Sequence, residues 1–146
     1  MSTDTDIGIL LGLAYGAFVA EMHADLAARG FGDLGRSYGY VFRVLADGDR
    51  SLSELAGLLG MTLPGAGKIV DEMVERGYVE RHPDRSDRRV KRLRLSSRGR
   101  AALKAARAFH RRFERRLADG PALRAALECI ARDTNVGPAP RYVRPL

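Results

Sequence analysis

The sequence is poor in the residues that build disulfides, metal clusters and membrane spans. It has one cysteine, Cys129, and no tryptophan. A single cysteine excludes an intrachain disulfide and any metal site made of several thiolates. The longest apolar run, residues 7–20, is interrupted by glycines and follows Asp4 and Asp6, whereas a signal peptide begins with basic residues. We see no segment that approaches the roughly 18 uncharged apolar residues of a membrane span, and we expect a cytoplasmic protein that does not bind membranes.

Signatures of catalysis and of cofactor binding are also missing. The sequence contains neither the glycine motif of a nucleophile elbow nor a glycine-rich phosphate loop. His23, His82 and His110 are far apart and have no partner at metal-ligand spacing. We therefore expect no enzyme, no cofactor and no metal site. We interpret Cys129 as a small buried residue, because redox-sensing thiols are exposed and have a low pKa.

The composition is that of one folded domain with an anionic partner. The chain has 146 residues, of which 45% are hydrophobic and 29% charged, enough to bury a core and remain in solution. Arginine outnumbers lysine by 22 to 3, and the net charge is +7. Because arginine binds phosphate and carboxylate with two hydrogen bonds at once, an anionic polymer is the expected partner.

The positive charge is concentrated in two blocks. Between Arg76 and Arg100 there are ten basic residues and three acids, so this segment alone accounts for the net charge. A second block, residues 104–116, has six cations and one acid, Glu114. We interpret the second block as a solvated helix face and the first as a binding surface, because of the structure predicted around it.

Apolar spacing predicts a mainly α fold with a small β-hairpin. Residues recurring three and four apart predict helices over 5–28, 36–46, 52–59, 64–76, 98–118 and 121–133, the first of them with one apolar stripe. Ser51 and Glu54 form a capping box in front of the third helix. Alternating apolar and polar residues predict strands over 78–81 and 90–95. Three prolines in residues 134–146 predict an extended tail.

This order is that of a winged helix-turn-helix module that binds duplex DNA. The third helix would cross the DNA backbone and the fourth, the recognition helix, would enter the major groove. The residues that would approach bases and phosphates there are Thr62, Leu63, Pro64, Gly65, Ala66, Gly67 and Lys68. The hairpin would be the wing, with Arg85, Arg88 and Arg89 at a flexible tip suited to a narrow minor groove.

Three stretches resemble the MarR family of transcriptional regulators: Val70–Arg81, Asp84–Arg89 and Leu95–Gly99. The resemblance implies a homodimer, in most members a repressor, on a pseudo-palindromic site. It implies three regions: residues 1–34 as a dimerisation helix, 35–97 as the DNA-binding domain, and 98–146 as dimerisation helices with the tail. It also implies a candidate pocket for a small aromatic effector, for which the sequence offers Tyr15, Phe18, Tyr38, Phe42, Phe109 and Phe113.

The start of the recognition helix departs from the family pattern. Members of the family usually carry side chains there that bond base edges, whereas this chain has Pro64, Gly65, Ala66 and Gly67. Direct contacts with bases would then be few, and contacts with thymine methyl groups and DNA shape would matter more. Two alternatives stay open: a sequence-tolerant architectural DNA-binding protein, and a ligand-binding or interaction dimer that has lost DNA recognition. The arginines of the wing argue against the second.

Overall fold

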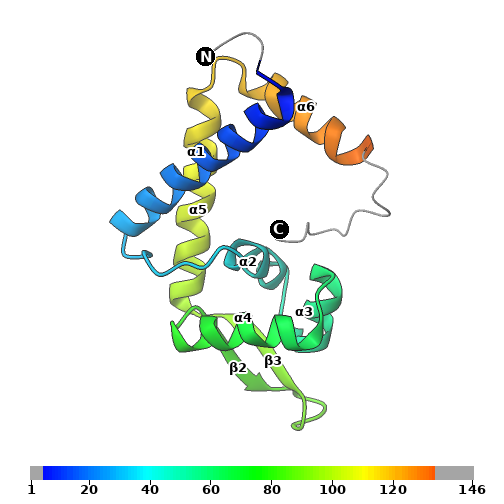
Figure 1. Cartoon of the computed structure of the whole chain (residues 1–146). Helices are drawn as coiled ribbons and strands as arrows, with labels where there is room; N and C mark the ends of the chain where they lie inside the picture. The colour runs from blue at the N-terminus through cyan, green and yellow to red at the C-terminus, as the bar shows by residue number, and fades with distance from the viewer. Residues whose placement is uncertain (1–4, 134–146) are drawn as a thin grey trace. The chain divides into compact units, whose positions relative to one another are not determined.

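The computed structural model describes residues 5–133, which fall into two compact units divided between Leu34 and Gly35. The first unit holds α1 (Ile7–Ala28). The second holds α2 (Tyr38–Ala46), β1 (Arg50–Ser51), α3 (Leu52–Leu59), α4 (Leu63–Glu75), β2 (Val79–Pro83), β3 (Lys91–Leu95), α5 (Ser97–Arg116) and α6 (Gly120–Asp133), as Figure 1 shows. The predicted mainly α fold with a small winged sheet is confirmed. The extended tail predicted for residues 134–146 lies outside the described residues.

The helix α1 is confirmed, but its apolar side chains are not confined to one stripe. Ile9 and Leu13 are exposed as well as Ile7, Leu11 and Tyr15, so apolar residues surround the helix. Among the described helices, α1 is the one that is long and apolar enough to cross a membrane by length and composition, with a mean hydropathy of 1.5 over 18 residues. The expectation that no segment approaches a membrane span is therefore wrong. Glycines interrupt the run of large residues without adding charge.

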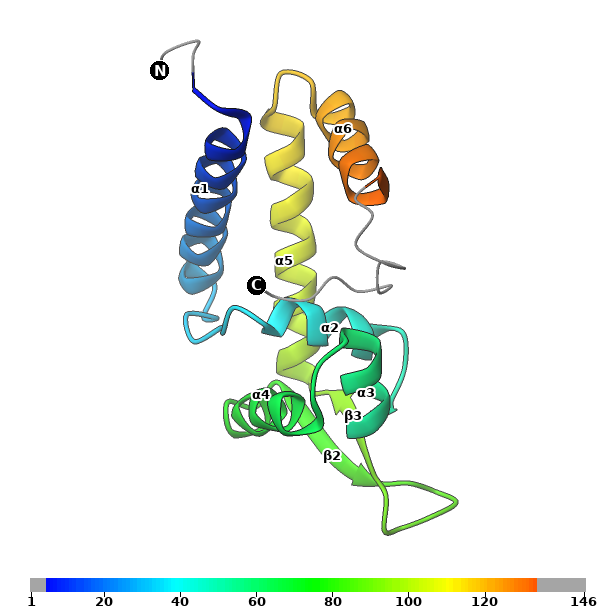
Figure 2. The same cartoon turned by 45° about the vertical axis from the view of Figure 1, so that its right-hand side comes forward.

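The predicted hairpin is part of a three-stranded antiparallel sheet in the order β1-β3-β2. The hairpin pairs Val79 with Leu95 and Pro83 with Lys91. The extra strand, β1, pairs Arg50 with Leu93 across the other edge of β3. Two residues are too short to show a period of two, so the sequence pattern did not predict β1. In Figure 2 the hairpin extends away from the helices of its unit.

The turn between α3 and α4 follows from the caps at both helix starts. The hydroxyl of Ser51 accepts a hydrogen bond from the Glu54 backbone N–H (3.1 Å), and the Glu54 carboxylate accepts one from the Ser51 N–H (2.9 Å). The predicted capping box is confirmed. The Thr62 hydroxyl caps α4 by accepting from the Gly65 N–H (3.2 Å). The helix therefore begins one residue earlier than predicted, and Pro64 is its second residue, not its first.

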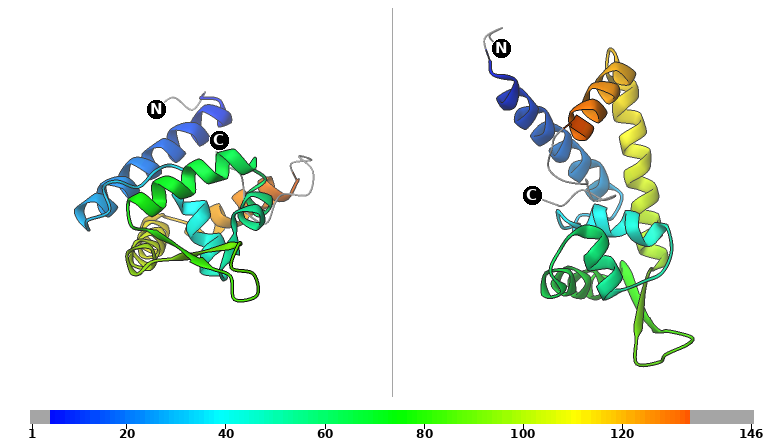
Figure 3. Two further views of the ribbon diagram at one scale, coloured as in Figure 1. Left: turned by 90° about the horizontal axis from the view of Figure 1, so that it is seen from below. Right: turned by 90° about the vertical axis from the view of Figure 1, so that its right-hand side faces the viewer.

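The core of the second unit is apolar and aromatic. Tyr38, Phe42 and Tyr78 pack edge to face, with ring centroids 5.7–6.4 Å apart. Val70 and Met73, on the inner face of α4, are completely buried. These contacts fix α4, seen from below in the left view of Figure 3, against the rest of its unit, while Pro64, Lys68 and Asp71 are exposed.

One tight junction connects the end of α4, the sheet and the start of α5. Gly77 ends α4 with a φ of +78°, a conformation that favours glycine. The Ser96 hydroxyl donates to the Gly77 carbonyl and accepts from the Gly99 N–H (3.0 Å). A Cβ on Gly99 would lie 2.1 Å from the carbonyl oxygen of Tyr78, so only glycine fits there. The wing is therefore attached directly to the end of the recognition helix.

Candidate nucleic-acid interface

The outer face of α4 is formed by the residues opposite its buried stripe. Ala66, Val70 and Met73 recur at helical spacing and face the core. Pro64 and Lys68 lie on the exposed side. Ala66 is only 1% exposed, so the expectation that it approaches DNA is wrong. Its position follows from the same stripe that holds the helix in place.

The other predicted residues of this helix lie at its start. Thr62 is exposed, and Gly65 and Gly67 are half-buried. A Cβ on Gly67 would point toward Leu52 of α3, at 3.6 Å from its Cδ2. Leu63 is 49% exposed, an unusually open position for a large apolar side chain. The start of α4 therefore presents an apolar surface with one cation, Lys68.

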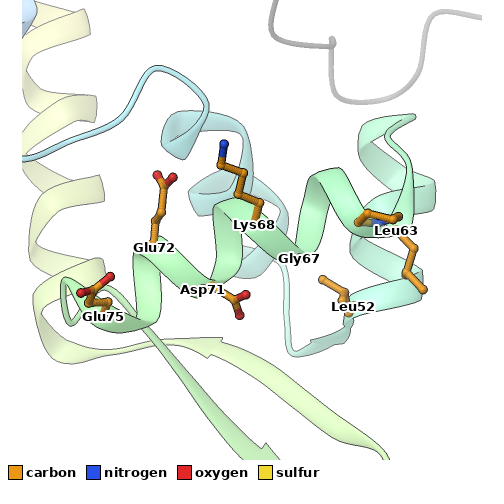
Figure 4. Close-up of a pocket in the computed structure, with 8 residues that line it drawn as sticks. Leu52, Leu63, Gly67, Lys68, Asp71, Glu72 and Glu75 are labelled. Atoms are coloured by element: carbon orange, nitrogen blue, oxygen red, sulfur yellow. The ribbon is translucent and has the colours of Figure 1, made fainter.

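A groove of about 690 Å³ runs along this face (Figure 4). Its lining residues are Leu52, Leu63, Pro64, Gly67, Lys68, Asp71, Glu72 and Glu75. Figure 4 shows Leu52 and Leu63 near the start of α4 and the carboxylates of Glu72 and Glu75 toward its end. Because carboxylates repel phosphates, the first half of the helix is the half suited to contact DNA.

Two of these carboxylates have partners in the neighbouring elements. Asp71 forms an ion pair with Arg81 of β2. The hydroxyl of Tyr38 donates to Glu72 at 3.4 Å. These acids were not among the predicted site residues, although Asp71 and Glu75 follow Lys68 by three and seven residues. That spacing places all three on one helix face.

The wing tip, residues 84–90, is closed by its own hydrogen bonds. The Asp84 carboxylate accepts from the backbone N–H groups of Ser86 (3.0 Å) and Asp87 (3.1 Å). The Asp84 N–H donates to the carbonyl of Val90 (2.9 Å). The hydrogen bond from the Ser86 hydroxyl, followed by those from the two N–H groups, lowers the pKa of Asp84. Asp84 therefore stays ionised and shapes the loop that displays the arginines.

The three predicted wing arginines are all exposed. Arg85 and Arg88 form no hydrogen bond or ion pair within the described part of the chain. Arg89 lies 3.1 Å from Asp87, but its side chain is 92% exposed. Exposed pairs of this kind contribute little free energy. All three guanidinium groups are thus available to an external anion.

Other arginines of the same block have partners within the unit. Arg92 bonds Glu54 (3.1 Å) and the carbonyl of Asp49 (2.8 Å). Arg94 bonds Glu80 (3.1 Å). The guanidinium of Arg98 lies 4.6 Å from the ring centre of Tyr78. These contacts brace the sheet, whereas Arg85 and Arg88 at the wing tip have no such partner among the described residues.

The six aromatic residues of the candidate effector pocket belong to three helices, α1, α2 and α5. Tyr38 and Phe42 are core residues that pack together. Phe109 and Phe113 are neighbours on α5, with ring centroids 5.9 Å apart. Tyr15 and Phe18 belong to the first unit. The groove along α4 is lined by none of the six.

Cys129 differs from its expected environment. It is exposed on α6, and its thiol donates to the Asp133 carboxylate (3.1 Å). That hydrogen bond, with a smaller contribution from burial, raises its pKa. The expectation of a buried residue is wrong. The raised pKa keeps the thiol protonated, which disfavours oxidation.

Comparison with known proteins identifies the fold and gives a family match over the winged module. Residues 33–90 match the model of the MarR family, which confirms the resemblance seen in the sequence. The structure of RV1404 from Mycobacterium tuberculosis has a TM-score of 0.69 and 21% identity, covering 92% of this chain and 99% of that one. No curated protein matches the sequence.

Two further structures are those of proteins studied with DNA. BpsR from Bordetella bronchiseptica, whose DNA binding is regulated by 6-hydroxynicotinic acid, has a TM-score of 0.66 and 21% identity, covering 94% of this chain and 98% of that one. A MarR mutant from E. coli in complex with operator DNA has a TM-score of 0.63 and 19% identity, covering 88% of this chain and 97% of that one. At these identities the likeness shows the fold.

Proposed function

We propose that this chain, which carries a MarR-family winged helix-turn-helix, is a cytoplasmic DNA-binding transcriptional regulator. The observation that carries the proposal is the wing tip, where Arg85, Arg88 and Arg89 are exposed at the end of a braced hairpin. Guanidinium groups presented in this way suit a narrow minor groove. The first turn of α4, with Thr62, Pro64, Gly65, Gly67 and Lys68, would lie in the adjacent major groove.

The working form is a homodimer that represses by occupying a pseudo-palindromic site. Exposed apolar side chains support it: Leu123, Leu127 and Ile130 form a stripe on α6, and α1 is apolar on all sides. Such surfaces are typical of interfaces. The first unit and the C-terminal helices would then be the dimerisation regions, with half-sites about one turn of DNA, roughly 34 Å, apart.

Neutralising the wing tests the DNA-binding surface. The double variant Arg88→Gln/Arg89→Gln would remove four phosphate contacts from a dimer and lower the salt dependence of binding by about 4 in log–log slope. The measurement is fluorescence anisotropy of a duplex titrated at several salt concentrations. Arg115→Gln, which removes an exposed charge from the end of α5, is the control. Equal binding by the wing variant and the control would contradict the assignment of the wing.

Charge placed on the α6 stripe tests the dimer. Leu127→Asp would convert the protein to monomers in sedimentation analysis and weaken DNA binding, because one half-site contact is lost from each complex. Ala125→Asp, on the opposite face of α6, is the matched control. A dimer that survives Leu127→Asp unchanged would rule out α6 as an interface.

A second function is favoured by one observation, the lack of long side chains at the start of α4. Pro64, Gly65 and Gly67 offer few hydrogen bonds to base edges. A sequence-tolerant architectural protein would bind random duplex almost as tightly as any genomic site at the same salt concentration. Selection of bound fragments from the source genome separates the two: a regulator enriches a symmetric site, and an architectural protein enriches none.

The most specific part of the proposal is that a small aromatic ligand releases the protein from DNA. It is supported by the fold shared with BpsR, whose DNA binding responds to 6-hydroxynicotinic acid. Such a ligand would bind more tightly to a conformation of the dimer in which the two recognition helices have a spacing that does not fit DNA. Titrating the DNA complex with 6-hydroxynicotinic acid and following anisotropy tests this step. No release at saturating ligand would exclude this compound as an effector.

A further inference from the structure

A second groove lies in the second unit where α2, β3 and α5 meet. Its volume is about 400 Å³. Leu45, Ala46, Leu95 and Leu103 give it an apolar part. The three leucines are each only 5% exposed, so they form a fixed floor. A cavity of this size and lining is within the range of small-molecule sites.

The rim of this groove is strongly basic. Arg100, Lys104, Arg107 and Arg111 follow one another at spacings of four, three and four along α5, a row about 16 Å long. Arg94 adds a fifth cation, and Asp49 is the one acid among the lining residues. Both of these last residues have a partner: Arg94 bonds Glu80 (3.1 Å), and Asp49 lies 3.0 Å from His82.

The charges of the α5 row are not compensated. Arg100 donates to neutral acceptors, the carbonyl of Leu95 (2.8 Å) and the hydroxyl of Ser97 (3.1 Å), which position it without cancelling its charge. Among the described residues, Lys104, Arg107 and Arg111 have no hydrogen-bond or ion-pair partner. A ligand with several negative charges would find the row open.

A half-buried cation behind the row adds to the positive potential. Arg43 of α2 donates to the carbonyl of Gly39 (3.0 Å) and lies 3.3 Å from His110 Nε2, with no carboxylate partner in the described chain. Burial, then repulsion from Arg107, lowers its pKa. Burial, then Arg43, lowers the pKa of His110. A bound anion would offset the repulsion between Arg43 and Arg107.

We propose that this groove binds an organic diphosphate or triphosphate. Its phosphates would bridge Arg100, Lys104, Arg107 and Arg111, and its apolar part would lie on the floor formed by Leu45, Leu95 and Leu103. A ligand with a single carboxylate would contact only part of this row of four cations. Duplex DNA is too wide to enter the groove, and α5 extends away from the wing tip, as the right view of Figure 3 shows. The site is therefore additional to the DNA-binding surface.

Calorimetric titration with geranyl diphosphate and inorganic pyrophosphate tests the proposal. Both ligands carry a diphosphate, but only the first has an apolar chain. We expect geranyl diphosphate to bind the full chain more tightly than pyrophosphate. The variant Lys104→Gln/Arg107→Gln should lose roughly tenfold or more in affinity for both ligands, because charge-assisted hydrogen bonds are lost. Arg115→Gln, one turn beyond the groove on the same helix, should stay within about twofold, since it is an exposed charge outside the lining.

Each other outcome overturns a stated part of the proposal. Equal affinity for the two ligands would overturn the role of the apolar floor. Equal losses in Lys104→Gln/Arg107→Gln and Arg115→Gln would show a diffuse charge effect and no site. Loss of DNA binding in the groove variant, with geranyl diphosphate binding unchanged, would assign the row to the DNA backbone. Thermal melts confirm folding, which the exposed positions of both substituted residues should preserve.

Discussion

The first turns of α4 combine a proposed DNA contact with a weak helix, and Gly67→Ala tests both properties. A Cβ at position 67 would lie 3.6 Å from Leu52 Cδ2, an ordinary contact that fills space without a clash. Glycine inside a helix costs about 1 kcal/mol relative to alanine. We expect Gly67→Ala to raise the free energy of unfolding by about 1 kcal/mol and the melting temperature by roughly 3 to 5 °C.

Gly65→Ala is the matched control for this prediction. Its Cβ would lie 3.0 Å from the Thr62 hydroxyl oxygen, which caps the helix. The gain in helix propensity would be offset by displacement of the cap, so Gly65→Ala should stabilise the protein less. Circular dichroism melts and urea titrations measure both variants. Destabilisation by Gly67→Ala, or a larger gain from Gly65→Ala, would refute the reasoning.

The same variant tests whether flexibility of α4 opposes DNA binding. If the start of the helix is ordered fully only on DNA, a stabilisation of about 1 kcal/mol would appear as up to fivefold tighter binding. The side chain added by Gly67→Ala would lie beside Leu52 in the groove along α4. Weaker binding by a more stable variant would show that glycine is needed for close approach to DNA.

Three further predictions concern stability. Gly99→Ala should lower the free energy of unfolding by about 3 kcal/mol or more in urea titrations, because its Cβ would meet the Tyr78 carbonyl at 2.1 Å. Thr62→Ala should cost about 1 kcal/mol in the same assay by removing the cap of α4. Burial and Arg43 hold the pKa of His110 below 6.5 in the folded state, so the unfolded chain takes up the proton first and stability should fall as pH drops below 6.5. His110→Gln should flatten this dependence, and a slope that persists would assign it to other groups.

Local chemistry was sufficient to predict most helix boundaries. The capping box of Ser51 and Glu54 and the glycine after α4 fixed where helices begin and end, and both features are read directly from neighbouring residues. The two-residue strand β1 is too short to show an alternation of apolar and polar residues, and it forms because it pairs with the edge of β3. The buried position of Ala66 was within reach of the sequence, since Val70 and Met73 follow it at helical spacing.

Exposure was harder to predict than secondary structure. Cys129 and the α6 stripe are exposed in the chain by itself, although their neighbours are apolar. Whether such a surface is covered depends on a second molecule, and a single sequence carries no direct signal for it. The aromatic residues show the converse: Tyr38 and Phe42 were candidates for a pocket, but they pack against Tyr78 and fill the core.

The pairing of arginines could not be predicted from charge counts. Arg81, Arg94 and Arg92 bond acids that are 10, 14 and 38 residues away in the sequence. The fold brings such partners together. The number of basic residues in the 76–100 segment therefore overstates the number of unpaired cations that can contact DNA. Three of the ten cations, Arg81, Arg92 and Arg94, are thus paired with distant carboxylates, and this changes a measurable quantity.

The salt dependence of DNA binding measures how many cations of the wing and of α4 contact phosphate. Arg85, Arg88, Arg89 and Lys68 are four exposed cations, and four in each of two protomers would give a log–log slope of about −7. If all ten basic residues of the block contacted phosphate in each protomer, the slope would be near −18. Anisotropy titrations over a range of potassium chloride concentrations distinguish these values. A slope near the larger value would require Arg92 and Arg94 to exchange their carboxylates for phosphates, and the braced wing would then have to rearrange on DNA.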